Sequence, residues 1–408
     1  MNLRTLLLSA PLAAVLACGG SSGTGSASLD AATPSFSKLA MDQVAADTTP
    51  PAAAIPVLST TVAPTELMGT GAGCHPHLLL REREVVERVN RHVYKVLGRI
   101  ERLLATNPVS ETSTEKTWTK VENGITYSFT IRYTTANRYA WELDAGPTPT
   151  DATPLPVVMT GYIDRSTATG AHEGFGEMQI DFAKLHAAFP FERAASGTLD
   201  VAFNVSATRR LISAVATDVV WELDASHFDG GYVPPALEQP RSGAYVYLRE
   251  PGKGGSLQIQ DQMAFGCLMT GGTTTADLTP ADARMVSRWY RTSDGTVHGR
   301  SDGEISGGPF ASGPIARIVG VTCHDASAEQ HMPSEGFWLV KAEGPAPDYA
   351  TVLGFSTASV GETGATPCDP ELGAVPLLAD STNDFSAWPT ADSYTSGTPF
   401  PFPGMTTP

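Results

Sequence analysis

Residues 123–131 read Asn-Gly-Ile-Thr-Tyr-Ser-Phe-Thr-Ile, and this stretch decides the fold. Over 125–131, apolar and polar residues alternate, which places them on opposite faces of a β-strand. The Asn-Gly pair at 123–124 is typical of a β-hairpin turn, and residues 138–143 are the expected partner strand. The stretch therefore predicts an antiparallel hairpin.

The same period of two continues through residues 116–345, where Gly, Pro, Asn or Asp clusters separate most of the alternating runs. The further strand candidates are 156–163, 176–183, 198–205, 211–223, 243–249, 256–262, 284–291, 316–322 and 337–342. About ten or more strands with short links predict a mainly β (α+β) protein built on an antiparallel meander. Such a sheet must close, curl or be covered at its edges.

Residues 77–105 carry the one strong helix signal. Apolar residues recur every seven positions in two rows, namely Leu79, Val86, Val93 and Ile100, and Val89, Val96 and Leu103. This pattern predicts a long amphipathic helix that ends at Asn107-Pro108. Packing on the β-sheet is the preferred interpretation, and the alternatives are a coiled-coil dimer, a membrane-surface helix or a lid over a cavity.

Together these patterns predict one long N-terminal helix on a curled sheet, a half-barrel or a barrel. This outline resembles the half-barrel carriers of lipoproteins and lipids in bacterial envelopes. The resemblance is one of fold alone, so it implies a concave apolar face between helix and sheet without assigning a ligand.

Two segments of the β region repeat at nearly the same offset. Trp141-Glu142-Leu143-Asp144-Ala145 reappears at residues 221–225, and residues 176–181 are echoed at 255–260. The shared offset favours two tandem β units, about 116–195 and 196–275. The alternative is chance combined with common strand chemistry.

The first residues predict export. Leu6 to Leu16 is an almost wholly apolar run, too short to span a membrane, and Arg4 precedes it. Val15-Leu16-Ala17-Cys18 resembles the lipobox of bacterial lipoproteins. That resemblance implies a signal peptide over residues 1–17, lipidation of Cys18 and a membrane anchor in the cell envelope. Because Gly19 follows instead of Asp, it further implies the outer membrane, at its periplasmic or surface face.

Two regions are predicted to lack regular structure. Residues 18–73 are rich in Ser, Thr, Ala and Pro and show no sustained period, which predicts a flexible tether with a root-mean-square span of ~40 Å. Residues 346–408 are predicted to be a mostly irregular C-terminal tail. The folded body is then expected over residues 74–345.

Four cysteines remain beside Cys18, and they are Cys74, Cys267, Cys323 and Cys368. An even number in an oxidising compartment predicts one or two disulfides, with the pairing left open. The alternative is a metal or redox site built from Cys74-His75-Pro76-His77 and Cys323-His324. The chain lacks a CxxC pattern, so we predict neither a metal site nor a cofactor.

The charge balance bears on partners. The chain has a formal net charge of −16, which argues against nucleic acid because that partner requires basic patches. A protein partner or an apolar ligand remains open.

No catalytic residue is predicted. Residues 299–303 match the G-x-S-x-G pattern, but the Gly- and Pro-containing stretch at 304–309 cannot start the helix that a nucleophile elbow needs, so a turn is expected. Glu142 with Asp144, and Glu222 with Asp224, place two carboxylates on one strand face, a geometry that glycosidases use when the facing distance fits. A non-enzymatic binding or structural lipoprotein is the first hypothesis. A lipid-anchored hydrolase of envelope or extracellular polymers is the alternative.

Overall fold

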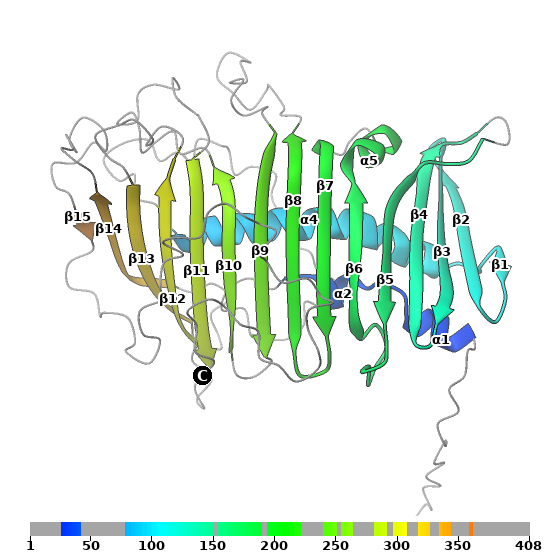
Figure 1. Ribbon diagram of the computed structural model, residues 1–408, viewed down its shortest axis with the longest axis horizontal. Helices are drawn as coiled ribbons and strands as arrows, with labels where there is room; N and C mark the ends of the chain where they lie inside the picture. The colour runs from blue at the N-terminus through cyan, green and yellow to red at the C-terminus, as the bar shows by residue number, and fades with distance from the viewer. Residues whose placement is uncertain are drawn as a thin grey trace, which may run out of the picture.

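The computed structural model describes residues 26–41, 78–149, 153–189, 194–221, 240–250, 254–263, 281–291, 297–307, 317–326, 334–343 and 359–361. Fifteen strands form one antiparallel sheet in which each strand pairs with its neighbours in sequence (Figure 1). Among the described residues, β1 and β15 each pair on one side only, so the sheet is open. The predicted mainly β, antiparallel meander is confirmed.

The strands are β1 Ser110–Glu111, β2 Glu115–Glu122, β3 Ile125–Thr135, β4 Arg138–Pro147, β5 Val157–Asp164, β6 Gly174–Asp181, β7 Ala194–Val205, β8 Arg210–Trp221, β9 Arg241–Glu250, β10 Gly254–Met263, β11 Ala281–Arg291, β12 Val297–Ser306, β13 Arg317–Ala326, β14 Ser334–Glu343 and β15 Ser359–Gly361. The helices are α1 Ser26–Ala31, α2 Phe36–Leu39, α4 Leu78–Leu104 and α5 Phe182–Ala188. In α5, the Asp181 side chain caps the first turn by accepting a hydrogen bond from the Lys184 backbone N–H.

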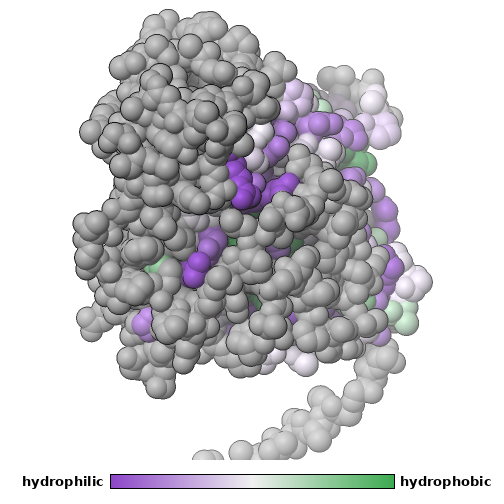
Figure 2. Space-filling view, turned by 60° about the vertical axis from the view of Figure 1, so that its left-hand side comes forward, coloured by the Kyte–Doolittle hydropathy of each residue, from purple (hydrophilic) through white to green (hydrophobic). Residues whose placement is uncertain are grey.

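The alternation of apolar and polar residues along the strands places them on two different faces of the sheet. On the inner face, paired residues of β2 to β5 such as Trp118, Phe129, Leu143 and Met159 are buried. On the outer face, the neighbouring row of β2 to β7 is polar, with Thr117 3.1 Å from Thr130 through their hydroxyls. Figure 2 shows that the coloured surface at its right-hand side is mostly hydrophilic. One buried face and one solvated face are expected of an antiparallel sheet, and β2 to β7 follow this pattern. In β10 to β12 residues on both faces are buried, such as Ile259 and Gln258 on β10 and Val286 and Ser287 on β11.

Helix α4 runs across the strands on the inner side of the sheet (Figure 1). It contacts β2 near one end of the sheet and β12 and β13 toward the other. Its buried apolar stripe contains Val86, Val89, Val93, Val96, Leu97, Ile100 and Leu103, which join the sheet residues in one core. None of the helices described in this structure combines the length and apolar character that crossing a membrane requires.

The N-terminal region corrects the sequence prediction. Residues 26–41 lie within the expected tether, yet they form α1 and α2 and bury Leu29, Ala32 and Met41 against the sheet and α4. We call residues 26–41 the N-terminal segment. The expectation of an unstructured tether is therefore wrong for this segment. The rest of 18–73, and residues 346–408 apart from β15, lie outside the described residues.

The tandem β units stay a prediction: Trp141 and Trp221 lie in β4 and β8, and residues 176–181 and 255–260 lie in β6 and β10. Trp141 lies in the middle of β4, whereas Trp221 is the last residue of β8. Through the intervening pairs, the residue of β8 level with Trp141 is Ala214. Trp141 and Trp221 therefore lie at different heights of the sheet.

Candidate functional site

The N-terminal segment crosses one end of the sheet, where hydrogen bonds and ion pairs bind it to strands, loops and α4. We define the docking end as the strand ends and turns at 134–137, 164–173 and 206–209, which join β3 to β4, β5 to β6 and β7 to β8. In Figure 1, α1 lies at the lower edge of the sheet, and α2 lies further along toward the middle strands.

An ion pair fixes α1 to the first strands. The Lys116 ammonium lies 2.7 and 2.8 Å from the two carboxylate oxygens of Asp30, and 3.4 Å from Glu111. The Lys116 side chain is only 6% exposed. A buried ammonium is costly unless it is paired, and Lys116 is paired with Asp30 of α1 at the shorter distance and with Glu111 at the longer one.

The backbone after α1 is recognised by side chains and main chain of the sheet. The Trp141 indole N–H donates to the Ala32 carbonyl at 2.9 Å, and its ring stacks on Phe203 with centroids 5.9 Å apart. The His172 backbone N–H donates to the Ala31 carbonyl at 2.7 Å, and its ring Nδ1 lies 2.8 Å from the Thr33 carbonyl. These contacts satisfy carbonyls that would otherwise be buried without a donor.

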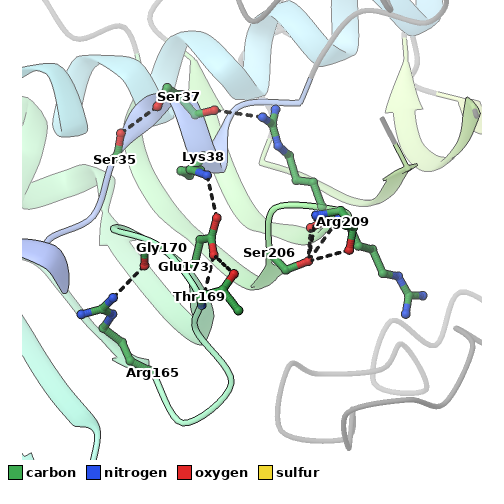
Figure 3. Close-up of polar contacts among 11 residues, drawn as sticks. Ser35, Ser37, Lys38, Arg165, Thr169, Gly170, Glu173, Ser206 and Arg209 are labelled. Carbon is green, nitrogen blue, oxygen red and sulfur yellow. Dashed lines mark hydrogen bonds and ion pairs between the residues drawn. The ribbon is translucent and has the colours of Figure 1, made fainter. Parts of the chain in front are cut away.

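A second ion pair fixes α2 to the loop between β5 and β6. The Lys38 ammonium lies 3.1 Å from Glu173, which also accepts a hydrogen bond from the Thr169 hydroxyl at 2.9 Å (Figure 3). Burial alone would raise the pKa of Glu173, but the bonds from Lys38 and Thr169 outweigh it and hold that pKa below its ordinary value. Arg165 closes the loop by donating to the Gly170 carbonyl at 2.7 Å.

The end of the segment is held between β8 and α4. Arg210 donates to the Ala40 carbonyl at 2.8 Å and to the Ser37 carbonyl at 3.0 Å. Asn90 of α4 accepts from the Met41 backbone N–H at 2.8 Å and donates to the Met41 carbonyl. Strands, a loop and the long helix therefore all bind the segment. This arrangement can fix residues 26–41 to the folded body.

The predicted carboxylate pair lies elsewhere, on the outer face of β4. Burial, and secondly the charge of Glu142, raise the pKa of Asp144 to about 6. Arg132 lies 3.9 Å from Glu142 and 2.7 Å from Glu115, so it partly balances the pair. Both carboxylates stand on one strand of an open sheet face. The second pair, Glu222 and Asp224, lies outside the described residues.

The G-x-S-x-G stretch is not a turn, so that expectation is wrong. Residues 299–303 lie within β12, paired to β11 and β13. Ser301 is fully buried, and its hydroxyl lies 2.6 Å from that of Ser287 on β11. A serine in mid-strand lacks the strand–turn–helix context of a nucleophile elbow. Arg300 and Asp302 in the same stretch form a two-bond ion pair at 2.7 and 2.8 Å.

Cys323 is disulfide-bonded and nearly buried on β13. Its sulfur is then no thiolate ligand, which removes the metal or redox alternative based on Cys323-His324. Cys18, Cys74, Cys267 and Cys368 lie outside the described residues. Within the described ranges, no three His, Cys, Asp or Glu side chains gather in a way that could hold a metal ion.

Sequence reasoning missed the residues of the docking site. The available signal was weak, since Leu29, Phe36, Leu39 and Met41 are scattered apolar residues in a stretch of small and polar ones. Comparison with known protein families, curated proteins and solved structures finds no match to this chain.

Proposed function

We propose that this protein is a lipid-anchored lipoprotein of the bacterial cell envelope, attached to the outer membrane through Cys18, with a binding or structural role instead of a catalytic one. The lipobox-like sequence before Cys18 and the Gly19 that follows support the lipid anchor and the outer-membrane location. The observation that carries the proposal is the docked N-terminal segment, which begins eight residues after Cys18 and is bound to the folded body.

The lipid anchor and the outer-membrane location are tested by mass spectrometry of the mature N-terminus and by membrane fractionation after expression in a Gram-negative host. We expect a chain that begins at Cys18, carries acyl groups and fractionates with the outer membrane. The Cys18→Ser variant is the matched control and should retain its signal peptide unacylated. A wild-type chain cleaved elsewhere and free of acyl groups would refute the anchor.

A partner protein is favoured over an apolar ligand. A carrier needs an empty apolar space between helix and sheet, but among the described residues this space holds Leu29, Leu39 and Met41 of the N-terminal segment. Buried carboxylates also serve the fold, as Glu173 does with Lys38 and Glu304 does with Arg317. Lipid extraction of protein purified from the envelope tests the choice, because a stoichiometric bound lipid would favour the carrier role.

The proposal includes a sheet that curls over α4, as in the half-barrel outline. A 27-residue helix is about 40 Å long. In a flat sheet, β2 and β13 would lie about 53 Å apart at ~4.8 Å per strand. Because α4 contacts both strands, curvature of the sheet and the reach of the contacts at the two helix ends together would cover the difference of about 13 Å.

The raised pKa of Asp144 favours a second candidate, a lipid-anchored hydrolase of envelope or extracellular polymers. A carboxyl group that stays protonated near pH 6 beside a second carboxylate has the chemistry of a general acid. Hydrolysis of purified envelope polysaccharides by wild type, and its loss in both Asp144→Asn and Glu142→Gln, would support this role. Activity that survives both substitutions would exclude the pair.

A further inference from the structure

The docking end of the sheet is the end nearest to the attachment point. The N-terminal segment enters the fold at Ser26, and α1 lies against β2 and β3 beside the turns of that end (Figure 1). Lys116, the partner of Asp30, is the second residue of β2, and His172, which binds Ala31, lies in the turn at 164–173. The chain therefore leaves the body at the docking end.

The length of chain before Ser26 limits how far the body can stand from the bilayer. Ser26 follows Cys18 by eight residues, and eight extended residues span at most about 29 Å. The opposite end of the sheet, near Val121 at the end of β2, lies further away by roughly the length of a strand. For the eleven residues of β3 this length is about 35 Å.

We infer that the docking end faces the membrane surface, with the strands pointing away from it, so that the body is held close to the lipid in a preferred orientation. This inference rests on the proposed lipid anchor. A preferred orientation of the body would replace the free rotation that a flexible tether of residues 18–73 would allow.

The exposed tips of this end fit a lipid headgroup surface without insertion. They carry small, uncharged residues, with Thr134, Thr135 and Asn137 in one turn and Ser166 and Thr167 in another. Proteins that insert into the interface commonly use aromatic side chains there. The described tips have none, so the anchor supplies the attachment and the fold supplies the orientation.

The test is energy transfer from a labelled protein to acceptor lipid in phosphatidylcholine vesicles. Donors are placed at Thr167→Cys on the docking end and at Val121→Cys on the opposite end, where Val121 is 57% exposed. Wild type treated in parallel corrects for labelling of native cysteines. We expect higher transfer from the Thr167 position, and a flexible insertion of about thirty residues after Gly20 should abolish the difference.

Equal transfer from the two positions, or higher transfer from Val121, would overturn the orientation. The protein is attached to the vesicles in two ways, so that the proposed orientation and the proposed lipid anchor are tested separately. One sample is the natively processed protein, and the other begins at Gly19 with six histidines bound to nickel-chelating lipid. If only the second sample binds vesicles and shows the difference, the orientation holds and the native lipid anchor is wrong.

Discussion

Leu29→Ala is the most direct test of whether the N-terminal segment is part of the folded body. Leu29 is fully buried on α1 and belongs to the main core. Truncation of a buried leucine to alanine costs about 2–5 kcal/mol, and the cost is lower where neighbours can close the cavity. Because α1 is a short helix at the rim of the core, we expect about 2–3 kcal/mol.

Urea denaturation with linear extrapolation measures this loss, and protease cleavage within residues 26–41 reports whether the segment leaves its site. Val121→Ala is the matched control, since Val121 is 57% exposed and its truncation should stay within about 0.5 kcal/mol. A Leu29→Ala variant as stable and as protease-resistant as that control would refute the claim that the segment is docked.

Three further outcomes follow from the structure. Trp141→Phe removes the donor to the Ala32 carbonyl and should lower the free energy of unfolding by about 1–3 kcal/mol, measured by the same denaturation. Burial and Glu142 raise the pKa of Asp144 from its ordinary 3.8 to about 6, so the folded state binds the proton more tightly; stability should fall as pH rises through this interval, and Asp144→Asn should remove that part of the pH dependence. Cys323→Ser should cost about 2–5 kcal/mol, and a reducing agent should lower the melting temperature of wild type by more than that of this variant.

The β-sheet could be predicted because its signal is carried by side chains. Alternation over 125–131 reports directly which residues face the core, and in the structure Tyr127, Phe129 and Ile131 are buried. The same holds for the apolar rows of α4. Where the pattern of side chains determines the packing, a single sequence contains the information.

The docking site could not be predicted because it is built on backbone groups. The carbonyls of Ala31, Ala32, Ser37 and Ala40 accept hydrogen bonds from residues more than a hundred positions away. Every residue has a carbonyl, so such contacts leave no mark on the composition of the segment. The composition of the segment therefore predicts a tether, although the backbone of the segment is bound along its length.

The glycines of 299–303 predict a turn where the structure has a strand, because glycine serves two different roles. In β12, Gly299 pairs with Trp289, and on the other side of that tryptophan stands Gly255. A Cβ atom at Gly255 would lie 2.5 Å from the Trp289 ring. Glycine in a strand can thus make room for an aromatic neighbour instead of turning the chain, and the two roles look alike in the sequence.

The docked segment also sets two states for the proposed anchor. While residues 26–41 are bound, about eight residues separate the lipid from the body; once they are released, the free chain would also include residues 26–41. The root-mean-square span of that chain then grows from about 16 Å to about 27 Å. Each 1.4 kcal/mol of docking free energy reduces the population with a released segment tenfold. A partner that bound residues 26–41 could therefore increase the distance between lipid and body only by competing with the core of the body for this segment.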